Sequence, residues 1–460
     1  MASTYLTKTF SGAATSQKIG TLSLWFKRGG TGATAEHDII AGPNGGNGGG
    51  NRAFIRIDGN NKIDFRLNNS SNTNITNRAF IDFNAWYHLV LAVDLTQAAG
   101  ADRMKLYING VEETSFSSQN YPGTSLDLVW GQQNVQTDIG YDTTDGGGGH
   151  FNGQMSHIHW VDGQQLTPSS FGETDATTGE WKIKASPSIS YGNNGFFILK
   201  DGNSVTDQSG NGHNFTVSGG TLTKTEDCPS NVFCCLNGLD TGWTGGNLNL
   251  ANGNNNTMNT SGAGDYGMRG TLAAKKGKYY MEFRTNNSGD GANTLGIAPT
   301  DLRLVQNITS GSPTAGVYAI QRYNDSSTNI YNNGTFTSQN TAMWGGYTNN
   351  SDIISFAVDL DNSKIFLAKN GVYKDTSGNT GDPAAGTNPT FTGLDSNKFY
   401  TFYTELRLNQ DNGTQCNFGN GYFGTTAVSS AGANASGNGI FEYDVPAGFT
   451  ALSTKGINSF

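Results

Sequence analysis

One short pattern occurs twice in this chain, and it restricts the fold more than any other feature. The first copy contains Ala92-Val-Asp-Leu95 and then Met104-Lys-Leu-Tyr-Ile-Asn-Gly-Val111. The second contains Ala357-Val-Asp-Leu360 and then Lys364-Ile-Phe-Leu-Ala-Lys-Asn-Gly-Val372. Because Asn-Gly tolerates positive φ at both positions, it favours a tight turn between antiparallel strands. The repeat therefore predicts one strand–turn–strand unit used in two related β-domains.

The two aspartates of the repeat, Asp94 and Asp359, each stand where an apolar strand ends. A carboxylate in that place can accept hydrogen bonds from the backbone N–H groups of the following turn. We therefore expect both aspartates to hold turns, and we look for functional residues elsewhere.

Short stretches of alternating apolar and polar residues recur along the chain, separated by clusters of Gly, Asn and Asp. A period of two is the signature of β-strands, and no apolar pattern at helical spacing exceeds two turns. The clearest strands are expected at residues 22–26, 54–57, 63–67, 86–95, 105–108, 195–199, 279–283 and 317–321. The predicted fold class is all-β.

The chain length of 460 residues fits two domains, because one β-sandwich often takes roughly 200–250 residues. We expect two tandem antiparallel β-sandwich (jelly-roll) domains, over residues 1–238 and 239–460. The boundary precedes a Gly- and Asn-rich stretch at residues 241–264.

Charge and cysteine content exclude several classes of partner. The net charge is −9 and no Lys/Arg cluster is visible, which argues against nucleic-acid binding. No apolar run reaches the roughly 18 residues of a membrane-spanning helix, and the N-terminus lacks the apolar stretch of a secretory signal. We therefore expect a protein that is made in a cytoplasm. The four cysteines, which include the vicinal pair Cys234-Cys235, are expected to be buried free thiols.

Carboxylates that could act in glycoside hydrolysis are not evident. A retaining glycosidase needs two carboxyl groups about 5–5.5 Å apart. The sequence has no Glu-x-Asp-x-x-Glu strand, and Glu282 and Glu405 stand alone in predicted strands. We therefore expect no enzyme activity, with a polysaccharide depolymerase as the least favoured alternative.

Three aspartates form the pattern best suited to hold an ion. Asp138, Asp142 and Asp145 surround Gly140-Tyr141 at a loop end, and calcium prefers carboxylate and carbonyl oxygens. Because turns rich in Asn and Asp give the same pattern without an ion, we expect no cofactor and keep calcium as the alternative.

Glycan binding would need aromatic rings that stack on sugar faces, with planar polar groups beside them. We expect Trp344 and Tyr347 to be exposed, because Gly and Asn surround them. Each of these aromatic side chains could instead fill a core. The candidate glycan-binding residues are Trp344, Tyr347, Tyr323, Asp325 and Tyr141.

Each half of the chain resembles a known family. Trp86-Tyr-His88, Leu106-Tyr-Ile-Asn-Gly110, Phe151-Asn-Gly153 and Asp207-Gln-Ser-Gly-Asn-Gly212 make the first half similar to laminin-G-like, concanavalin A-like jelly rolls. Gly277-Lys-Tyr-Tyr-Met-Glu-Phe283, Leu295-Gly-Ile-Ala298, Cys416-Asn-Phe-Gly419 and Val445-Pro-Ala-Gly-Phe449 make the second half similar to SPRY domains. Both resemblances imply sandwich folds that serve in binding.

The pairing also resembles tail-fibre and virion-surface proteins of marine tailed phages. The segments that carry this resemblance are Thr4–Thr9, Ser190–Phe197 and Cys228–Asn237. It implies a structural protein at the virion surface (fibre, tail or capsid), made in the host cytoplasm and adhering to host-surface glycans. Other virion proteins and further copies of the chain, as a trimer, are the implied partners. The alternative is a SPRY-type protein-binding or capsid-decoration module with no sugar ligand.

Overall fold

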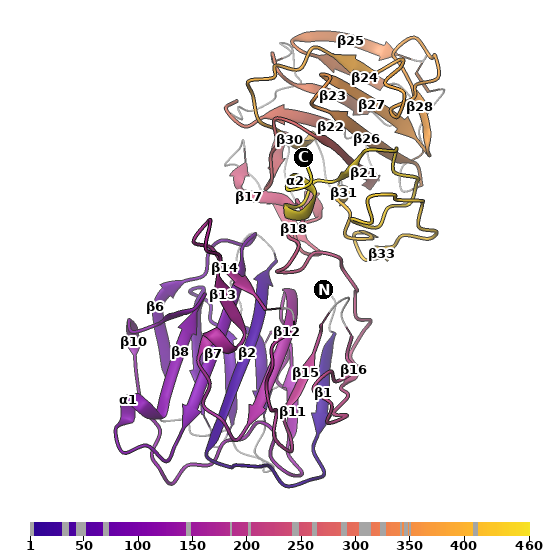
Figure 1. Ribbon diagram of the computed structural model, residues 1–460. Helices are drawn as coiled ribbons and strands as arrows, with labels where there is room; N and C mark the ends of the chain where they lie inside the picture. Colours follow the sequence, from indigo (N-terminus) through magenta and orange to yellow (C-terminus); the bar gives the residue numbers. More distant parts are fainter. Residues whose placement is uncertain are drawn as a thin grey trace. The chain divides into compact units, whose positions relative to one another are not determined.

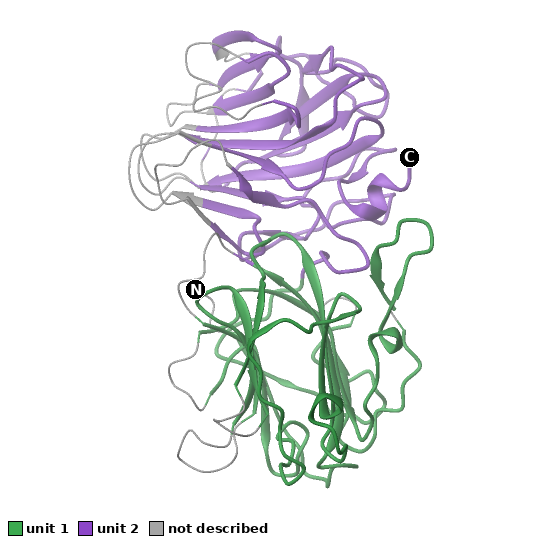
Figure 2. Ribbon diagram, turned by 90° about the vertical axis from the view of Figure 1, so that its left-hand side faces the viewer, with its two compact units in different colours: residues 1–28, 32–224 green, residues 29–31, 225–460 purple. Residues whose placement is uncertain are grey.

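The computed structural model describes most of the chain, which forms two compact units (Figure 2). Unit 1 comprises residues 1–28 and 32–224, and unit 2 comprises residues 29–31 and 225–460. The division after Lys224 precedes the boundary expected at residue 238. The described residues are 4–29, 36–42, 52–67, 73–143, 149–184, 186–200, 204–241, 248–259, 265–286, 292–302, 314–322, 328–340, 343–344, 348, 351–407 and 413–460.

Unit 1 is a sandwich of two antiparallel sheets, drawn as two layers in Figure 2. The eight-stranded sheet runs in the order β10 (Phe116–Ser118), β6 (Asn74–Ala79), β5 (Lys62–Arg66), β4 (Ala53–Ile57), β3 (His37–Gly42), β11 (Gln136–Ile139), β1 (Tyr5–Thr9) and β16 (Thr216–Ser218). The six-stranded sheet runs β15 (Phe196–Ile198), β12 (Gly153–Asp162), β2 (Ile19–Arg28), β7 (Trp86–Asp94), β8 (Met104–Ile108) and β9 (Val111–Glu112) (Figure 1).

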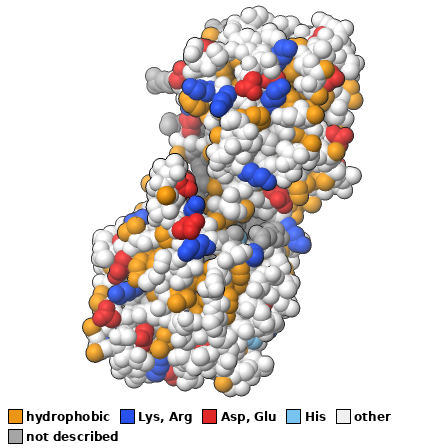
Figure 3. All heavy atoms as spheres, in the orientation of Figure 1, with side chains coloured by type: hydrophobic (Ala, Val, Ile, Leu, Met, Phe, Trp, Pro, Cys, Tyr) orange, Lys and Arg blue, Asp and Glu red, His pale blue; other side chains and the backbone are white. Residues whose placement is uncertain are grey.

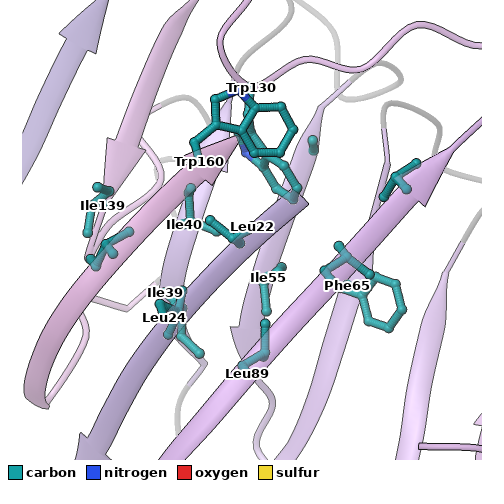
Figure 4. Close-up of a cluster of buried hydrophobic side chains, with 14 of the residues drawn as sticks. Leu22, Leu24, Ile39, Ile40, Ile55, Phe65, Leu89, Trp130, Ile139 and Trp160 are labelled. Carbon is teal, nitrogen blue, oxygen red and sulfur yellow. The ribbon is translucent and has the colours of Figure 1, made fainter. Parts of the chain in front are cut away.

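The core of unit 1 lies between these sheets. Because successive residues of a strand point to opposite faces, every second side chain enters the core. Figure 4 shows Leu22 and Leu24 of β2 beside Ile55 of β4, with the rings of Trp130 and Trp160 at one end. The two indoles meet edge to face at 6.0 Å, a favoured geometry for aromatic pairs.

The outer face of the six-stranded sheet is also apolar. Val90 of β7 and Val161 of β12 pack there against Phe171 and Tyr191. Figure 3 shows hydrophobic side chains gathered over this sheet. A short hairpin of β13 (Gly172–Thr174) and β14 (Trp181–Ile183) and the 3-10 turn Pro168–Ser170 belong to the same region. Strand β7 is therefore apolar on both faces.

Unit 2 also contains two main sheets. One runs β17 (Leu236–Thr241), β20 (Asp265–Gly270), β30 (Tyr400–Arg407), β22 (Ala292–Pro299), β23 (Tyr318–Arg322), β24 (Thr328–Asn332) and β25 (Thr335–Asn340). The other runs β18 (Leu248–Ala251), β19 (Asn256–Asn259), β31 (Gly413–Asn417), β21 (Lys278–Asn286), β26 (Ile353–Asp359), β27 (Lys364–Lys369) and β28 (Val372–Lys374), with β29 (Phe391–Thr392) on β27 and β34 (Thr450–Ala451) on β21. A small hairpin pairs β32 (Tyr422–Phe423) with β33 (Thr426–Ala427).

Helix is almost absent, which confirms the all-β class. The described α-helices are α1 (Gly100–Arg103) and α2 (Thr454–Ile457), each of one turn. Among the described residues, no helix has the length and apolar character needed to cross a membrane. Cys234, Cys235 and Cys416 are buried free thiols, as expected, whereas Cys228 is a free thiol that is only half-buried.

The repeated pattern forms the same hairpin in both units. In unit 1, strands β7, β8 and β9 are the last three of the six-stranded sheet, and β7 pairs with β2. In unit 2, strands β26, β27 and β28 are likewise the last three of their sheet, and β26 pairs with β21. Asn109 and Asn370 have φ of 50° and 51°, and the glycines that follow have φ of 80° and 78°. The Asn109 N–H donates to the His88 carbonyl (2.9 Å), and the Asn109 carbonyl Oδ1 accepts from the His88 N–H (2.8 Å). Asn370 makes the same two bonds with Ile353, both at 2.9 Å.

The aspartates of the repeat hold turns, as expected. Asp94 accepts the Thr96 N–H at 3.0 Å, and Asp359 accepts the Asn362 N–H at 3.0 Å. Lys278 also forms an ion pair with Asp359 at 2.9 Å. Both carboxylates are therefore committed to structure.

Candidate functional site

Polar and charged side chains occupy the outer face of the eight-stranded sheet of unit 1. Leu6 pairs with Ile139, and both face the core, so that Asp138, one residue earlier, faces outward. Strand pairing continues this outward row from Asp138 through Ala41 and Phe54 to Arg66. A neighbouring row joins Asp38 on β3, Arg56 on β4 and Asp64 on β5. Four adjacent strands thus place their outward residues in one patch.

Three aromatic rings, from Tyr5, Tyr141 and His150, meet at one end of this patch and are called the aromatic platform. Tyr141 stacks on His150 with ring centroids 4.1 Å apart and planes 13° apart. The Tyr5 ring lies 5.4 Å from Tyr141 and 5.9 Å from His150. All three side chains are half-buried, so that part of the stack remains open to solvent.

Backbone contacts hold the platform against the sheet. Gly140, which follows β11, has φ of 86°, a conformation that glycine adopts without steric cost. Its carbonyl accepts the Phe151 N–H at 2.8 Å, and the Asp38 N–H donates to the Gly149 carbonyl at 3.0 Å. The segment at residues 149–151 is therefore fixed beside β3 and the end of β11, which brings His150 to Tyr141.

Guanidinium groups and carboxylates surround the buried ring of Phe54. Arg56 pairs with Asp64 at 2.8 Å and also with Glu36. Arg52 pairs with Asp142 at 3.3 Å, next to Tyr141 of the platform. The three guanidinium carbons near the Phe54 ring lie at 4.9 Å (Arg52), 4.6 Å (Arg56) and 5.1 Å (Arg66) from its centroid. This set of side chains is called the charged cluster.

Asp38, which lies opposite Arg56 on the neighbouring strand, also belongs to the charged cluster. Asp38 and Asp64 each keep one carboxylate oxygen without a hydrogen bond from a described residue. Asp38 is 2% exposed and Asp64 is 3% exposed. Within the described part of the chain, Asp38 Oδ2 and Asp64 Oδ1 accept no hydrogen bond. Burial raises the pKa of Asp38 to about 7; the nearby Asp142 adds to the shift, whereas Arg56 and Arg52 oppose it.

The three aspartates proposed for calcium do not converge in the described structure. The Asp138 carboxylate accepts from the Thr143 hydroxyl (2.6 Å), the Thr143 N–H (3.2 Å) and the Gln136 amide (2.6 Å). Asp142 is paired with Arg52, and Asp145 lies outside the described residues. The described residues contain no group of three or more Asp, Glu, His or Cys side chains suited to a metal ion. A calcium site therefore stays a hypothesis.

The expectation that Trp344 is exposed is wrong. Its side chain is 6% exposed and belongs to the core of unit 2 with Met343 and Phe356. The Gly and Asn residues around Trp344 indicate a local turn, whereas the burial of its side chain depends on contacts with distant strands. Tyr347, Tyr323 and Asp325 lie outside the described residues. Tyr141 is thus the predicted glycan-binding residue that the described structure places in a partly exposed group of aromatic rings.

A serine and a histidine lie together on the opposite sheet, but their proton arrangement does not suit nucleophilic catalysis. Trp181 Nε1–H donates to His88 Nδ1 at 3.0 Å, so that His88 must carry its proton on Nε2. His88 Nε2 then donates to the Ser23 hydroxyl at 2.9 Å, whereas a general base would have to accept from it. Burial lowers the pKa of His88 to about 3, which keeps the ring neutral.

The buried glutamates of unit 2 have structural partners. Glu282 accepts hydrogen bonds from Tyr280 OH (3.0 Å) and Asn417 Nδ2 (3.2 Å), and from the N–H groups of Glu442 and Tyr443 (2.9 Å each). Four donors leave its carboxylate no free role. In the other sheet, Glu405 accepts from Tyr403 OH at 2.6 Å.

Sequence reasoning missed Tyr5, His150 and the charged cluster apart from Asp142, which it considered only as a calcium ligand. A signal was present in residues 52–57, where charged or aromatic residues alternate with core residues. That alternation marks an outward face, but it does not reveal which strands lie side by side. The platform joins residues from β1, from the end of β11 and from residue 150, and only the strand order brings these together.

One family model matches the part of the chain that contains the aromatic platform. The model of a family described as the concanavalin A-like lectin/glucanases superfamily (Laminin_G_3) matches residues 3–170, which include all three platform rings. No curated protein matches the chain.

Several solved structures resemble part of the chain. The SPRY domain of human HERC1 is 19% identical, with a TM-score of 0.26, 35% of this chain covered and 87% of that chain. The PSpry domain of TRIM65 is 12% identical (TM-score 0.27, 40% and 91% covered). The CBM40 module of Ruminococcus gnavus IT-sialidase, bound to α2,3-sialyllactose, is 16% identical (TM-score 0.23, 31% and 73% covered). The family match supports the jelly-roll description of residues 3–170, which are similar to the concanavalin A-like lectins and glucanases.

Proposed function

We propose that the chain is a non-catalytic binding protein that holds a glycan on the aromatic platform of unit 1. The observation that carries this proposal is the half-exposed stack of Tyr141 on His150, with Tyr5 beside it. Sugar sites combine ring faces with planar polar side chains, and Arg52 and Asp142 supply such groups next to Tyr141. The similarity of residues 3–170 to a superfamily that includes lectins supports the same role.

The lack of catalysis is part of this proposal. The carboxylates nearest the platform are engaged by arginines or by backbone and hydroxyl donors. Ser23 faces a histidine with its proton on the wrong nitrogen for a general base. Release of reducing sugar from a host polysaccharide by the purified chain would overturn this part.

A binding experiment with two tyrosine variants tests the site. The full chain is applied to an array of bacterial surface glycans, together with Tyr141→Ala and Tyr121→Ala. Tyr121 is a suitable control because it is 40% exposed and contacts Gly100 of α1 instead of the platform rings. We expect Tyr141→Ala to weaken binding about fivefold and Tyr121→Ala to leave it unchanged, since stacking contributes on the order of 1 kcal/mol. No sugar binding, or equal binding by both variants, would contradict the proposal.

We place this binding protein on the surface of a tailed-phage virion, as part of a fibre, tail or capsid. Support comes from the resemblance of Thr4–Thr9, Ser190–Phe197 and Cys228–Asn237 to such proteins. Other virion proteins, and copies of the chain in a trimer, are the proposed partners. Mass spectrometry and antibody labelling of purified particles test this role, and absence of the chain from the particle rules it out.

A second candidate is protein binding by unit 2 without a sugar ligand. Strand β25 ends its sheet, and its Phe336 is 45% exposed. An open sheet edge with an exposed ring can accept a strand from a partner protein. Cross-linking to another virion protein that is lost in Phe336→Asp, but kept in Tyr141→Ala, would favour this function.

A further inference from the structure

We infer that the aromatic platform selects neutral or amino sugars and discriminates against sugars that carry a carboxylate. This inference rests on the proposed glycan binding and specifies the chemical class of the ligand. It follows from the distribution of charge around the platform.

Acidic side chains outnumber basic ones on this face of unit 1. The described carboxylates in or beside the charged cluster are Glu36, Asp38, Asp64, Asp138 and Asp142, against the guanidinium groups of Arg52, Arg56 and Arg66. Clefts lined by one sign of charge attract ligands of the opposite sign and repel those of the same sign.

The arginines are largely committed to groups of the protein. Arg52 is paired with Asp142, and Arg56 is paired with both Asp64 and Glu36. Arg66 lies over the Phe54 ring and forms no ion pair with a described residue. The Arg66 guanidinium therefore remains to receive an acidic ligand. The carboxylates that surround it in the charged cluster outnumber the arginines and oppose such binding.

Buried polar atoms without a hydrogen bond do not by themselves set a preference. Among the described residues of the cluster they are two acceptors, Asp38 Oδ2 and Asp64 Oδ1, and two donors, Arg52 Nε and Arg66 Nε. The excess of carboxylates therefore decides the preference. A ligand carboxylate would meet this negative charge in surroundings where charges are poorly screened. The cluster thus disfavours ligands that bring a carboxylate.

The nearby histidines do not offset the negative charge. His37 Nδ1 lies 3.1 Å from the His150 carbonyl oxygen, and the His150 ring stacks on Tyr141. Burial lowers the pKa of His37 and of His150, so that both rings are neutral at neutral pH. The groups that set the charge facing Asp38 are therefore Arg52, Arg56, Asp142 and Glu36.

A comparison of matched sugars tests this selectivity. Uronic-acid oligosaccharides and their carboxyl-reduced counterparts, which keep the same linkage, are titrated against the full chain at pH 7.5 in low salt. We expect the reduced sugars to bind and the uronic acids to bind about tenfold more weakly or worse, because like charges brought together cost binding energy. Uronic acids that bind as tightly as the reduced sugars, or more tightly, would overturn the inference and leave the proposed glycan binding in place.

Two variants with the same change in net charge sharpen the test. Asp38→Asn removes the charge from the cluster, while Glu112→Gln removes one from an exposed position on β9, in the other sheet. We expect Asp38→Asn to narrow the gap between the two sugar classes and Glu112→Gln to leave it unchanged. Equal effects of both variants would trace the selectivity to net charge and refute the role of the cluster. If neither sugar class binds, and Tyr141→Ala changes nothing, the proposed function and this inference both fail.

Discussion

Glu282 is a single residue that connects two distant segments of unit 2. Its carboxylate is buried in β21 and accepts two backbone N–H groups from residues 442 and 443. It thereby ties a late segment of the chain to the middle of a sheet. Burial raises the pKa of Glu282 to about 7, although the four donated hydrogen bonds oppose the shift.

This pKa predicts how stability depends on pH. Between pH 4.5 and about 7, the folded state binds more protons than the unfolded state, because its pKa is the higher one. The contribution of Glu282 is therefore fully present below pH 4.5 and lost as pH rises through 7, by up to about 3 kcal/mol. Urea unfolding of wild type and Glu282→Gln at pH 5 and pH 8 measures this. The difference between the two proteins should change with pH, and a constant difference would refute it.

In unit 1, the residue His88 contacts two tryptophan side chains. Its imidazole stacks on the Trp25 ring (4.7 Å), and the Trp181 ring, 5.9 Å away, donates a hydrogen bond to it. We predict that Trp181→Phe lowers the free energy of unfolding by about 1–3 kcal/mol, since it keeps a ring but leaves Nδ1 of His88 without its donor. Thermal unfolding measures the loss. An unchanged melting temperature would mean that this hydrogen bond contributes nothing to stability.

At the scale of elements, the two hairpins offer an internal comparison. Asn109 and Asn370 make equivalent pairs of hydrogen bonds at equal φ. We predict that Asn109→Ala and Asn370→Ala destabilise their units by similar amounts, about 1–2 kcal/mol each, through strain at positive φ and a lost acceptor. Replacing either asparagine with Gly should remove the strain at positive φ, so that only the stability lost with the hydrogen-bond acceptor remains. A loss in one hairpin and none in the other would show that the two turns are not equivalent.

The same elements show what sequence can predict. The hairpins were predictable because Asn-Gly and the strand-ending aspartates act within a few residues of the chain. The strands at residues 54–57 and 279–283 were predictable from alternation, and the structure confirms them. Trp344 was not, since its burial depends on Phe356 and other residues of a core assembled from distant strands. The platform was also beyond reach, because Tyr5 and Tyr141 meet only through the pairing of β1 with β11.

For the whole molecule, the two units have separate hydrophobic cores. Leu24 belongs to the core of unit 1 and Phe283 to that of unit 2. We predict that Leu24→Ala and Phe283→Ala each cost about 2–5 kcal/mol in the unit that contains them. Calorimetry combined with limited proteolysis should show residues 32–224 lost first in the former variant and residues 225–460 in the latter. The same fragment lost first in both variants would contradict independent cores.

The asparagine that closes each hairpin also has a consequence for chemical ageing. Asn-Gly pairs deamidate when the glycine nitrogen attacks the asparagine side-chain carbonyl, a reaction that needs the amide to swing free of its neighbours. In the folded hairpins, Oδ1 of Asn109 and of Asn370 is held by a backbone N–H. Deamidation at these two sites therefore has to wait for the hairpin to open. The rate at which the tryptic peptide that contains each asparagine gains about one mass unit therefore measures how often that hairpin opens. Asn109 measures this rate in unit 1, and Asn370 measures it in unit 2.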